Sequence, residues 1–440
     1  MKPLLRMAYE GAGALARLAA EVAPDGDSKA LRSLRARRGI RNRYSAWAHT
    51  YRDPERHLVW MHAPSVGEGL QARPVIDILR RRQPNWQLAY TFFSPSAEAF
   101  ARSLAVDFSD YLPFDTTADA HAALDALKPA ALVFSKLDVW PVLAQEAFSR
   151  GVQLGLISAT LSPDSSRRKS AGAALLRDAY ALLHVVGAID PGDASRLTQL
   201  GVRPSTITVT GDTRYDQVWE RAQAADREHA LLAPLSSARP TLVAGSTWPS
   251  DETPILEAWR TLRLTFPAAR LIIAPHEPSE AHLQPIEQWA SAAGISCARL
   301  GTAEAGQQDI ILVDRTGVLG DLYALAQCAF VGGGFHRAGL HSVIEPAAFG
   351  IPVLFGPRYN GNRDASSLIA QGGGLSASSA SEIIAHIARW FADEDARSTA
   401  GDLAAAMVRN GLGAAERSAS LVESLMSQGA APASRAAAAQ

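Results

Sequence analysis

A single carboxylate stands in the tightest part of a turn in the stretch HAPSVGEGLQARP, residues 62–74. Glu68 lies between Gly67 and Gly69, shortly after the apolar run 58–61, where a strand pattern gives way to a helix pattern. Glycine neighbours shield a carboxylate poorly, so Glu68 can approach a bound hydroxyl group closely. Such a group suits general-base catalysis if its pKa rises when the site closes. From spacing alone, the simpler interpretation is a solvated acid at the start of a helix.

Two further polar loops follow apolar runs in the first half of the chain. SKLDVWP (135–141) carries Asp138, which can stabilise positive charge or orient an acceptor. TGDTRYD (210–216) carries Arg214, which can pair with an anion. For both residues the alternative interpretation is a surface ion pair at the edge of a domain.

In the second half, a Gly-rich turn at 332–334 precedes FHRAGLHSVIEPAAFGIPVLFGP, residues 335–357. The pattern predicts a helix that begins near His341 and carries Glu345 in its early turns. A helix N-terminus suits a phosphate, and a carboxylate there can accept hydrogen bonds from ribose hydroxyls. An acid that only complements the helix dipole is the alternative. The glycine spacing is not the dinucleotide-binding fingerprint.

Two more loops of the second half point to the same kind of site. APHEP (274–278) carries His276, which can donate to a phosphate or a carboxylate. DRTGVLGDLY (314–323) offers the short Thr316 side chain and the accessible backbone of Gly317. Each alone is an ordinary strand–helix turn, but together they indicate a nucleotide-sized site in the second half.

Short apolar runs alternate with helical patterns from residue 57 onward, and these elements must position the loops. The strand-like runs are 57–63, 86–93, 130–135, 152–159, 183–189 and 205–212, then 241–246, 269–275, 309–314, 328–334 and 352–357. Near-continuous apolar strands separated by helices predict parallel sheets covered on both faces. The fold class is therefore α/β, with two doubly wound, Rossmann-like domains and a ligand cleft between them at the carboxyl ends of the strands.

The 440 residues are too many for one ordinary core. We predict an N-terminal membrane-proximal segment at 1–45, a first domain at 46–225 that binds the acceptor, a second at 226–427 that binds the nucleotide sugar, and a disordered tail at 428–440. The last helix of the second domain is expected to return to the first. The polar stretch 220–240 is the predicted linker.

Composition excludes several classes of protein. A net charge of −1 gives no general affinity for nucleic acid. Only Cys297 and Cys328 are present, without companion ligands at zinc spacing, so neither a disulfide framework nor a metal site is expected.

The first residues lack the uninterrupted apolar run of a signal peptide or a membrane span. They predict an amphipathic helix, with Arg6, Glu10, Arg17 and Glu21 on one face and Leu4, Leu15, Leu18 and Ala19 opposite. An arginine-rich stretch, 32–43, follows. Such a helix can lie on an anionic membrane surface, or it can pack on its own domain beside a solvated basic face. The sequence favours neither.

Seven stretches, in this order, resemble the 3-deoxy-D-manno-octulosonic acid (Kdo) transferases of lipopolysaccharide synthesis. They are HAPSVGEGLQARP, YTFFSPS, YLPFDT, ISATLS, TGDTRYD, AGSTWPSDE and GGGFHRAGLHSVIEPAAFGIPVLFGP. The resemblance runs from about residue 57 to residue 357, and the Glu68 and Glu345 segments are its most specific parts.

The resemblance implies a GT-B glycosyltransferase. It implies inverting transfer of Kdo from CMP-Kdo to the acylated glucosamine disaccharide that precedes lipid A (lipid IVA), without a metal or another cofactor. The expected location is the cytoplasmic face of the inner membrane, as a peripheral or monotopic protein, with the membrane surface as a partner and no nucleic acid.

Residue roles also come from the resemblance. Glu68 matches the base that deprotonates the acceptor, and Asp138 and Arg214 match residues that support the transition state. The positions that match CMP-binding residues are Pro275, His276, Thr316, Gly317, Val318, Ser342, Val343, Ile344 and Glu345.

The chain departs from the common family pattern at several of these positions. Lys136 stands where many members have an acid, Asp138 is shorter than the usual glutamate, His276 replaces a common arginine, and Arg214 replaces a lysine. These departures affect the groups expected to contact the carboxylate and phosphate of the donor.

Three other functions share parts of this pattern. A GT-B enzyme with a UDP-sugar donor keeps the architecture and the Glu345 segment. A nucleotide-dependent oxidoreductase also uses Rossmann-like domains, but the missing fingerprint argues against it. A non-catalytic relative keeps the fold and loses the chemistry, against which the intact Glu68 loop argues.

Overall fold

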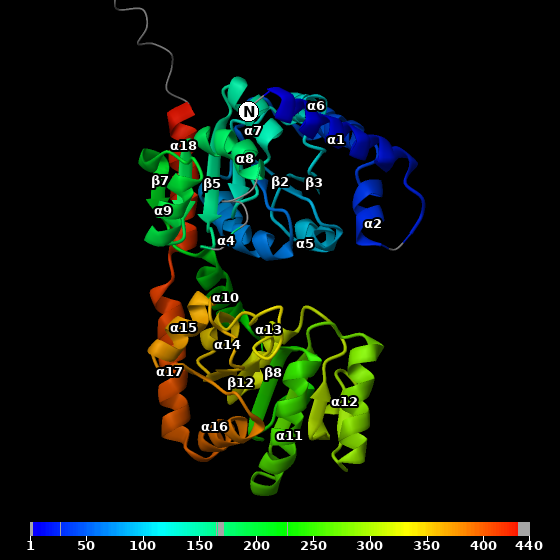
Figure 1. Ribbon diagram of the computed structural model, residues 1–440, viewed down its shortest axis with the longest axis vertical. Helices are drawn as coiled ribbons and strands as arrows, with labels where there is room; N and C mark the ends of the chain where they lie inside the picture. Colours follow the sequence, from blue (N-terminus) through cyan, green and yellow to red (C-terminus); the bar gives the residue numbers. More distant parts are fainter. Residues whose placement is uncertain (1–2, 27, 164, 166–170, 227, 430–440) are drawn as a thin grey trace, which may run out of the picture. The chain divides into compact units, whose positions relative to one another are not determined.

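The computed structural model describes residues 3–26, 28–163, 165, 171–226 and 228–429 (Figure 1). Its contacts divide the chain into two compact units, one running to Gln217 and resuming at Leu412, the other Val218–Gly411. The first division falls inside helix α10 (Thr213–Ala224), whereas the sequence predicted a change of domain at 225/226. Of the predicted tail 428–440, residues 430–440 lie outside the described residues.

The first unit is built on a seven-stranded sheet of order β3-β2-β1-β4-β5-β6-β7, in which all neighbours pair in parallel. Its strands are β1 (Leu58–His62), β2 (Gln87–Phe92), β3 (Phe108–Tyr111), β4 (Ala131–Ser135), β5 (Gln153–Ala159), β6 (Val185–Ala188) and β7 (Ile207–Val209). Every residue of β1, β2 and β4 is buried, as a parallel sheet covered on both faces requires.

Helices cover both faces of this sheet. They are α1 (Pro3–Val22), α2 (Lys29–Arg35), α3 (Ile40–Tyr51), α4 (Val66–Arg82), α5 (Glu98–Arg102), α6 (Thr117–Leu127), α7 (Pro141–Ser149), α8 (Ala171–Ala181), α9 (Pro191–Gln199) and α18 (Ala414–Gly429). The last of them, α18, comes from the far end of the chain and packs on α4, β5 and β6. This C-terminal helix is therefore part of the first unit.

The second unit repeats the architecture with a seven-stranded parallel sheet of order β10-β11-β9-β8-β12-β13-β14. Its strands are β8 (Thr241–Thr247), β9 (Arg270–Pro275), β10 (Cys297–Arg299), β11 (Ile310–Leu312), β12 (Cys328–Val331), β13 (Val353–Phe355) and β14 (Gly374–Ser376). Its helices are α11 (Pro249–Thr265), α12 (Glu280–Ala292), α13 (Leu319–Leu322), α14 (Ile344–Ala348), α15 (Arg363–Ala370), α16 (Ala380–Ala392) and α17 (Glu394–Asn410). The predicted α/β class with two doubly wound domains is confirmed.

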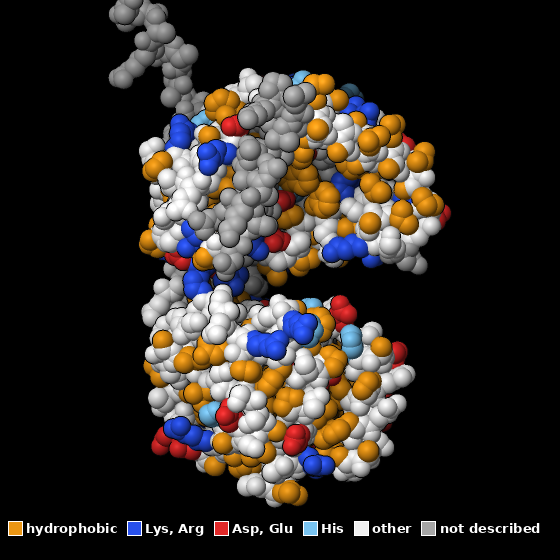
Figure 2. Space-filling model, viewed as in Figure 1, with side chains coloured by type: hydrophobic (Ala, Val, Ile, Leu, Met, Phe, Trp, Pro, Cys, Tyr) orange, Lys and Arg blue, Asp and Glu red, His pale blue; other side chains and the backbone are white. Residues whose placement is uncertain are grey.

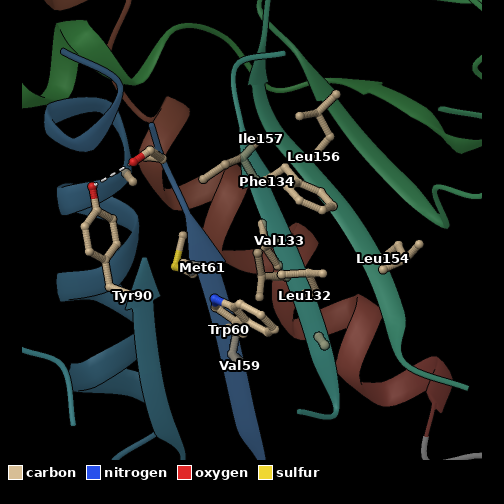
Figure 3. Packing of buried hydrophobic residues seen from close by; sticks show 14 of the residues in the cluster. Val59, Trp60, Met61, Tyr90, Leu132, Val133, Phe134, Leu154, Leu156 and Ile157 are labelled. Atoms are coloured by element: carbon tan, nitrogen blue, oxygen red, sulfur yellow. Dashed lines mark hydrogen bonds between the residues drawn. The ribbon is translucent and has the colours of Figure 1, made fainter. Parts of the chain in front are cut away.

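The core of the first unit lies on the sheet itself. Figure 3 shows Trp60 and Met61 of β1 beside Val133 and Phe134 of β4, all with almost no exposed surface. Burial of such side chains contributes about 1.5–3 kcal/mol each. This packing fixes the strand ends, and therefore the loops that follow them.

The sequence missed three strands, β3, β10 and β14, and all three are edge strands. Each has only three or four residues, and at least two residues in each are only partly buried. An edge strand needs no continuous apolar run, so the pattern that predicts central strands overlooks it. The predicted linker also differs, because Leu232 and Leu235 are buried in the core of the second unit.

Helix α1 packs on the first unit through its polar face. Arg6 donates to Glu146 (2.7 Å) and Thr117 (3.0 Å), and Tyr9 donates to Asp115 (2.9 Å). The opposite face is exposed: Met7, Leu15, Leu18 and Val22 keep between 60% and 79% of their surface. Figure 2 shows hydrophobic side chains over the part of the first unit where α1 runs.

The arginines that follow α1 do not form the solvated basic face that one interpretation required. Arg37 is buried against the ring of Phe93, Arg32 is exposed, and four further arginines are held by carboxylates or by backbone carbonyls. These pairs are Arg35 with Asp25, Arg38 with the carbonyls of Ala20 and Ala23, Arg41 with Asp119, and Arg43 with Asp110. Most of this basic stretch is therefore structural.

Candidate active site

Glu68 is the third residue of α4, the helix that follows β1. Ser65 precedes the helix in an extended conformation (φ −140°, ψ 177°), and this sharp change from strand to helix exposes the first turn. The side chain of Glu68 keeps 18% of its surface. The carboxylate is therefore held, yet remains within reach of a ligand.

Two side chains hold the Glu68 carboxylate. Ser65 donates its hydroxyl to Oε2, and Lys136 donates Nζ to Oε1 over 3.1 Å. Lys136 follows β4 with a left-handed φ of 65°. Burial opposes ionisation of Glu68, but the Ser65 hydrogen bond and the Lys136 charge outweigh it, so the pKa of Glu68 lies below its ordinary value.

The two glycines beside Glu68 have different roles. A Cβ on Gly69 would lie 2.4 Å from the ring of Phe100 and 2.7 Å from the Tyr90 hydroxyl, so close packing excludes a side chain there. A Cβ on Gly67 would meet nothing closer than 3.9 Å. Only Gly67 borders open space, so the expected clearance around Glu68 comes from one glycine.

Asp138 lies in a polar cluster at the same edge of the sheet, because β1 and β4 are neighbours. Its Oδ2 accepts from the Trp140 indole (3.0 Å) and faces Nε2 of the buried His62 (3.2 Å). Nδ1 of His62 faces the Thr91 hydroxyl at 3.0 Å. These hydrogen bonds therefore fix the orientation of the Asp138 carboxylate.

Arg214 stands at the start of α10, after the edge strand β7. Its Nε and Nη2 donate to the buried Asp212 over 2.9 and 2.6 Å. The neighbouring Thr213 hydroxyl is hydrogen-bonded to the Ser158 hydroxyl over 2.9 Å, at the end of β5. The start of α10 therefore reaches the strand beside β4, which carries Lys136 at its end.

In the second unit, His276 belongs to a group of four rings that we term the ring cluster: Trp248, His276, His336 and His341. Trp248 stacks on His336 (4.2 Å, 7°) and on His276 (4.8 Å, 29°). His276 stacks on His341 (4.4 Å), which accepts from the Trp248 indole (3.1 Å). Burial and the two nearby histidines lower the pKa of His341.

Asp251 joins the loops that carry the ring cluster. This buried carboxylate accepts from the backbone N–H groups of Trp248 (3.0 Å), Gly333 (2.8 Å) and Phe335 (2.9 Å). It thus ties the start of α11 to the loop after β12. The glycines at 332–334 allow backbones to meet: a Cβ on Gly332 would lie 2.2 Å from the Ser246 carbonyl, and one on Gly334 would lie 2.4 Å from the Gly356 nitrogen.

The helix predicted to begin near His341 begins at Ile344 and has only five residues. Proline at position 346 is tolerated because it lies within the first turn. Glu345 lies in that turn, where burial raises its pKa against the opposing effects of Arg221 and the Ser342 hydroxyl. The start of the helix therefore differs from the prediction, and a helix this short adds little dipole support for a phosphate.

The other residues expected to contact the nucleotide differ in accessibility. Pro275, Val343 and Ile344 are buried. Thr316 and Gly317 are exposed, and Val318 and Ser342 are half-buried. Gly317 has a φ of 91°, the left-handed region that favours glycine.

Sequence reasoning missed four side chains of these two clusters. The sequence shows Lys136 only as a departure from a family pattern and His341 only as the start of a predicted helix, and it gives Trp248 and His336 no separate role. The available signal is that Lys136, Trp248 and His336 lie one or two residues beyond the end of an apolar run. In the described part of the chain, no group of three or more His, Cys, Asp or Glu side chains is arranged to hold a metal ion.

Comparison with known proteins assigns the family. Residues 33–217 match the family described as 3-Deoxy-D-manno-octulosonic-acid transferase (kdotransferase). The 3-deoxy-D-manno-octulosonic acid transferase of Bordetella pertussis is 30% identical over 377 residues, 83% of this chain and 86% of the relative. The chain belongs to the Kdo transferase family. A second Kdo transferase, from Haemophilus influenzae, is 26% identical over 330 residues, 74% of this chain and 76% of the relative.

Similarity to solved structures identifies the fold of this member of the Kdo transferase family. A glycosyltransferase from Rickettsia africae aligns with a TM-score of 0.57 at 10% identity, covering 85% of this chain and 99% of its own. UDP-GlcNAc 2-epimerase from Neisseria meningitidis aligns with a TM-score of 0.60 at 14% identity, covering 84% and 100%. The fold is GT-B. Over the described residues, none of the helices combines the length and the apolar character needed to cross a membrane.

Proposed function

We propose that this chain transfers Kdo from CMP-Kdo to an acylated glucosamine disaccharide lipid, the precursor of lipid A. Membership of the Kdo transferase family supports the donor and the class of acceptor. The observation that carries the catalytic part is the Glu68 carboxylate, which is ionised, positioned by two hydrogen bonds and partly exposed.

In this proposal Glu68 is the proton acceptor. The acceptor hydroxyl loses its proton to the carboxylate as its oxygen bonds to the anomeric carbon of Kdo. The bond from that carbon to the phosphate oxygen breaks, and CMP leaves with the electron pair. Attack opposite the leaving group inverts the anomeric configuration. The low pKa of Glu68 keeps the base ionised before the acceptor binds.

The second unit holds the donor in this scheme. We assign the nucleotide to His276, the loop 316–318 and the segment 342–345, and add the ring cluster as a platform beside them. Imidazole N–H and backbone N–H groups meet the phosphate, so the proposal assigns no metal to the leaving group. Asp138 and Arg214 are assigned to support of the transition state.

We further propose that α1 docks on the cytoplasmic surface of the inner membrane. Its polar face is occupied by contacts with the first unit, and its exposed face carries the apolar stripe of Met7, Leu15, Leu18 and Val22. An amphipathic helix with this orientation can bury its apolar face at the boundary of headgroups and acyl chains. Such docking brings the enzyme to a lipid acceptor.

The test is a transferase assay on the wild-type chain with CMP-Kdo generated in place and a tetra-acylated lipid A precursor. A product heavier by one or more Kdo units supports the proposal. CMP and UDP are compared as ligands in parallel, because UDP-sugar enzymes share the fold. Binding of UDP without CMP, and no Kdo product, would favour a UDP-sugar transferase instead.

A further inference from the structure

Arg221 lies on α10, in the part that belongs to the second unit, and makes a two-armed contact with the loop after β11. Its Nε donates to Oδ1 of Asp321 over 3.1 Å, and its Nη2 donates to the Gly317 carbonyl over 3.0 Å. The guanidinium lies directly against Gly320, where a Cβ would come within 2.3 Å of Cζ. A glycine at position 320 is therefore needed for this close approach.

The charge of Arg221 also affects Glu345, in the other segment assigned to the donor nucleotide. Its charge opposes the burial that raises the pKa of Glu345, so it favours the ionised form of that carboxyl group. Gly317 and Glu345 follow different strands, β11 and β12, which β9 and β8 separate in the sheet. One side chain thus affects both segments assigned to the nucleotide.

We propose that Arg221 is a positioning residue for the transfer reaction, which holds the 316–318 loop through Gly317 and Asp321. The inference rests on the proposed function, because it concerns the donor site of that function. Arg221 need not touch the donor. It fixes the carbonyl of Gly317, an exposed glycine in the left-handed conformation.

The contact requires an arginine. A guanidinium presents its N–H groups as a rigid fork, which fits a carboxylate oxygen and a carbonyl oxygen at once. A lysine at this position keeps the positive charge near Glu345 but has a flexible single ammonium group. Arg221→Lys therefore removes the fork but keeps the charge, whereas Arg221→Met removes both.

The experiment measures KM for CMP-Kdo, kcat and the dissociation constant for CMP in the full-length wild type and both variants. We expect Arg221→Met to raise KM for the donor and weaken CMP binding, each roughly 10- to 100-fold, because a charge-assisted contact that preorganises the loop is lost. We expect kcat to change by less than about threefold, since uniform binding is lost. Arg221→Lys gives a smaller rise in KM.

Arg299→Met is the matched control. Arg299 lies in the same unit with similar exposure (31% against 33%) and donates to Glu280 and Glu287 beside the edge strand β10. We expect it to leave donor KM unchanged. Wild-type KM in both Arg221 variants, or an equal rise in Arg299→Met, overturns the inference. Absence of Kdo transfer in the wild type would instead contradict the proposed function.

If Arg221→Met does not fold, Arg221→Lys and Asp321→Asn decide the matter. Asp321 is half-exposed on its short helix, and its replacement removes only the carboxylate arm of the contact. A rise in donor KM in both supports the positioning role. Unchanged donor KM in both contradicts it.

Discussion

At the scale of single residues, the side chain that distinguishes the first unit is Lys136. It donates to the Glu68 carboxylate from the end of the neighbouring strand, and it is one of the groups that lower the pKa of Glu68. A base must be ionised to accept a proton, so in the proposed mechanism Lys136 extends the active range of Glu68 toward acid pH.

Replacing Lys136 by methionine removes that charge, so the pKa of Glu68 rises. The acid limb of the profile of kcat/KM against pH then moves to higher pH, and activity at pH 5 falls relative to the wild type. Lys128→Met is the control, because Lys128 also has a left-handed φ (44°) but precedes β4 instead of following it. An unmoved acid limb in Lys136→Met would show that the ion pair does not set the ionisation of the base.

At the scale of elements, Asp251 joins the start of α11 to the loop after β12. Replacing it by alanine leaves three backbone N–H groups without their acceptor, including those of Trp248 and Gly333. We expect the free energy of unfolding to fall by about 3 kcal/mol or more and CMP binding to weaken as the ring cluster loosens.

Asp393→Ala is the comparison for that measurement. Asp393 caps α17 through one exposed hydrogen bond to the Ala396 nitrogen (2.9 Å), so its loss costs about 1 kcal/mol and leaves CMP binding intact. Urea unfolding followed by tryptophan fluorescence gives the free energy of unfolding of each variant. Equal losses in the two variants would mean that Asp251 does no more than cap a helix.

The central elements of both sheets could be predicted from sequence, because buried parallel strands produce continuous apolar runs. The edge strand β7 lies in the predicted run 205–212, but β3, β10 and β14 could not be predicted, since they are short and lack a continuous apolar run. The start of α14 was predicted too early because the residues before Ile344 are folded back in a loop, which local pattern does not reveal.

The candidate site was predictable only in part, for a related reason. Residues such as Glu68 and Glu345 stand in motifs that sequence can show. The Lys136–Glu68 pair and the ring cluster depend on which strands are neighbours, and this follows from sheet order. The sequence also predicts poor shielding of Glu68 by both of its glycine neighbours, whereas the space beside Gly69 is filled by the ring of Phe100.

At the scale of the whole molecule, the orientation of α1 is the feature with the largest consequence. An amphipathic helix normally turns its apolar face inward, whereas here Arg6 and Tyr9 contact the rest of the first unit, and Leu15 and Leu18 are exposed. Exposed contiguous apolar surface of this kind marks an interaction site.

Replacing both Leu15 and Leu18 by glutamate tests the membrane role without disturbing the fold, since neither side chain is buried. We expect co-sedimentation with phosphatidylethanolamine–phosphatidylglycerol vesicles to fall roughly tenfold or more, because apolar burial at the interface is lost. The midpoint of thermal unfolding stays unchanged.

Leu264→Glu in the second unit is the control for that substitution. Leu264 keeps 84% of its surface and lies on α11. Its replacement by glutamate adds a negative charge but leaves the apolar stripe of α1 unchanged. Undiminished vesicle binding in the double variant would remove α1 from the account of membrane docking.

The measurement that tests the central claim most directly compares the wild type with Glu68→Gln in the transferase assay, with product masses recorded and CMP binding measured on both. We predict a Kdo-bearing product from the wild type, and a loss of rate of at least about 100-fold in Glu68→Gln with CMP binding retained. Full activity in a Glu68→Gln protein that binds CMP normally would contradict the assignment of Glu68 as the base.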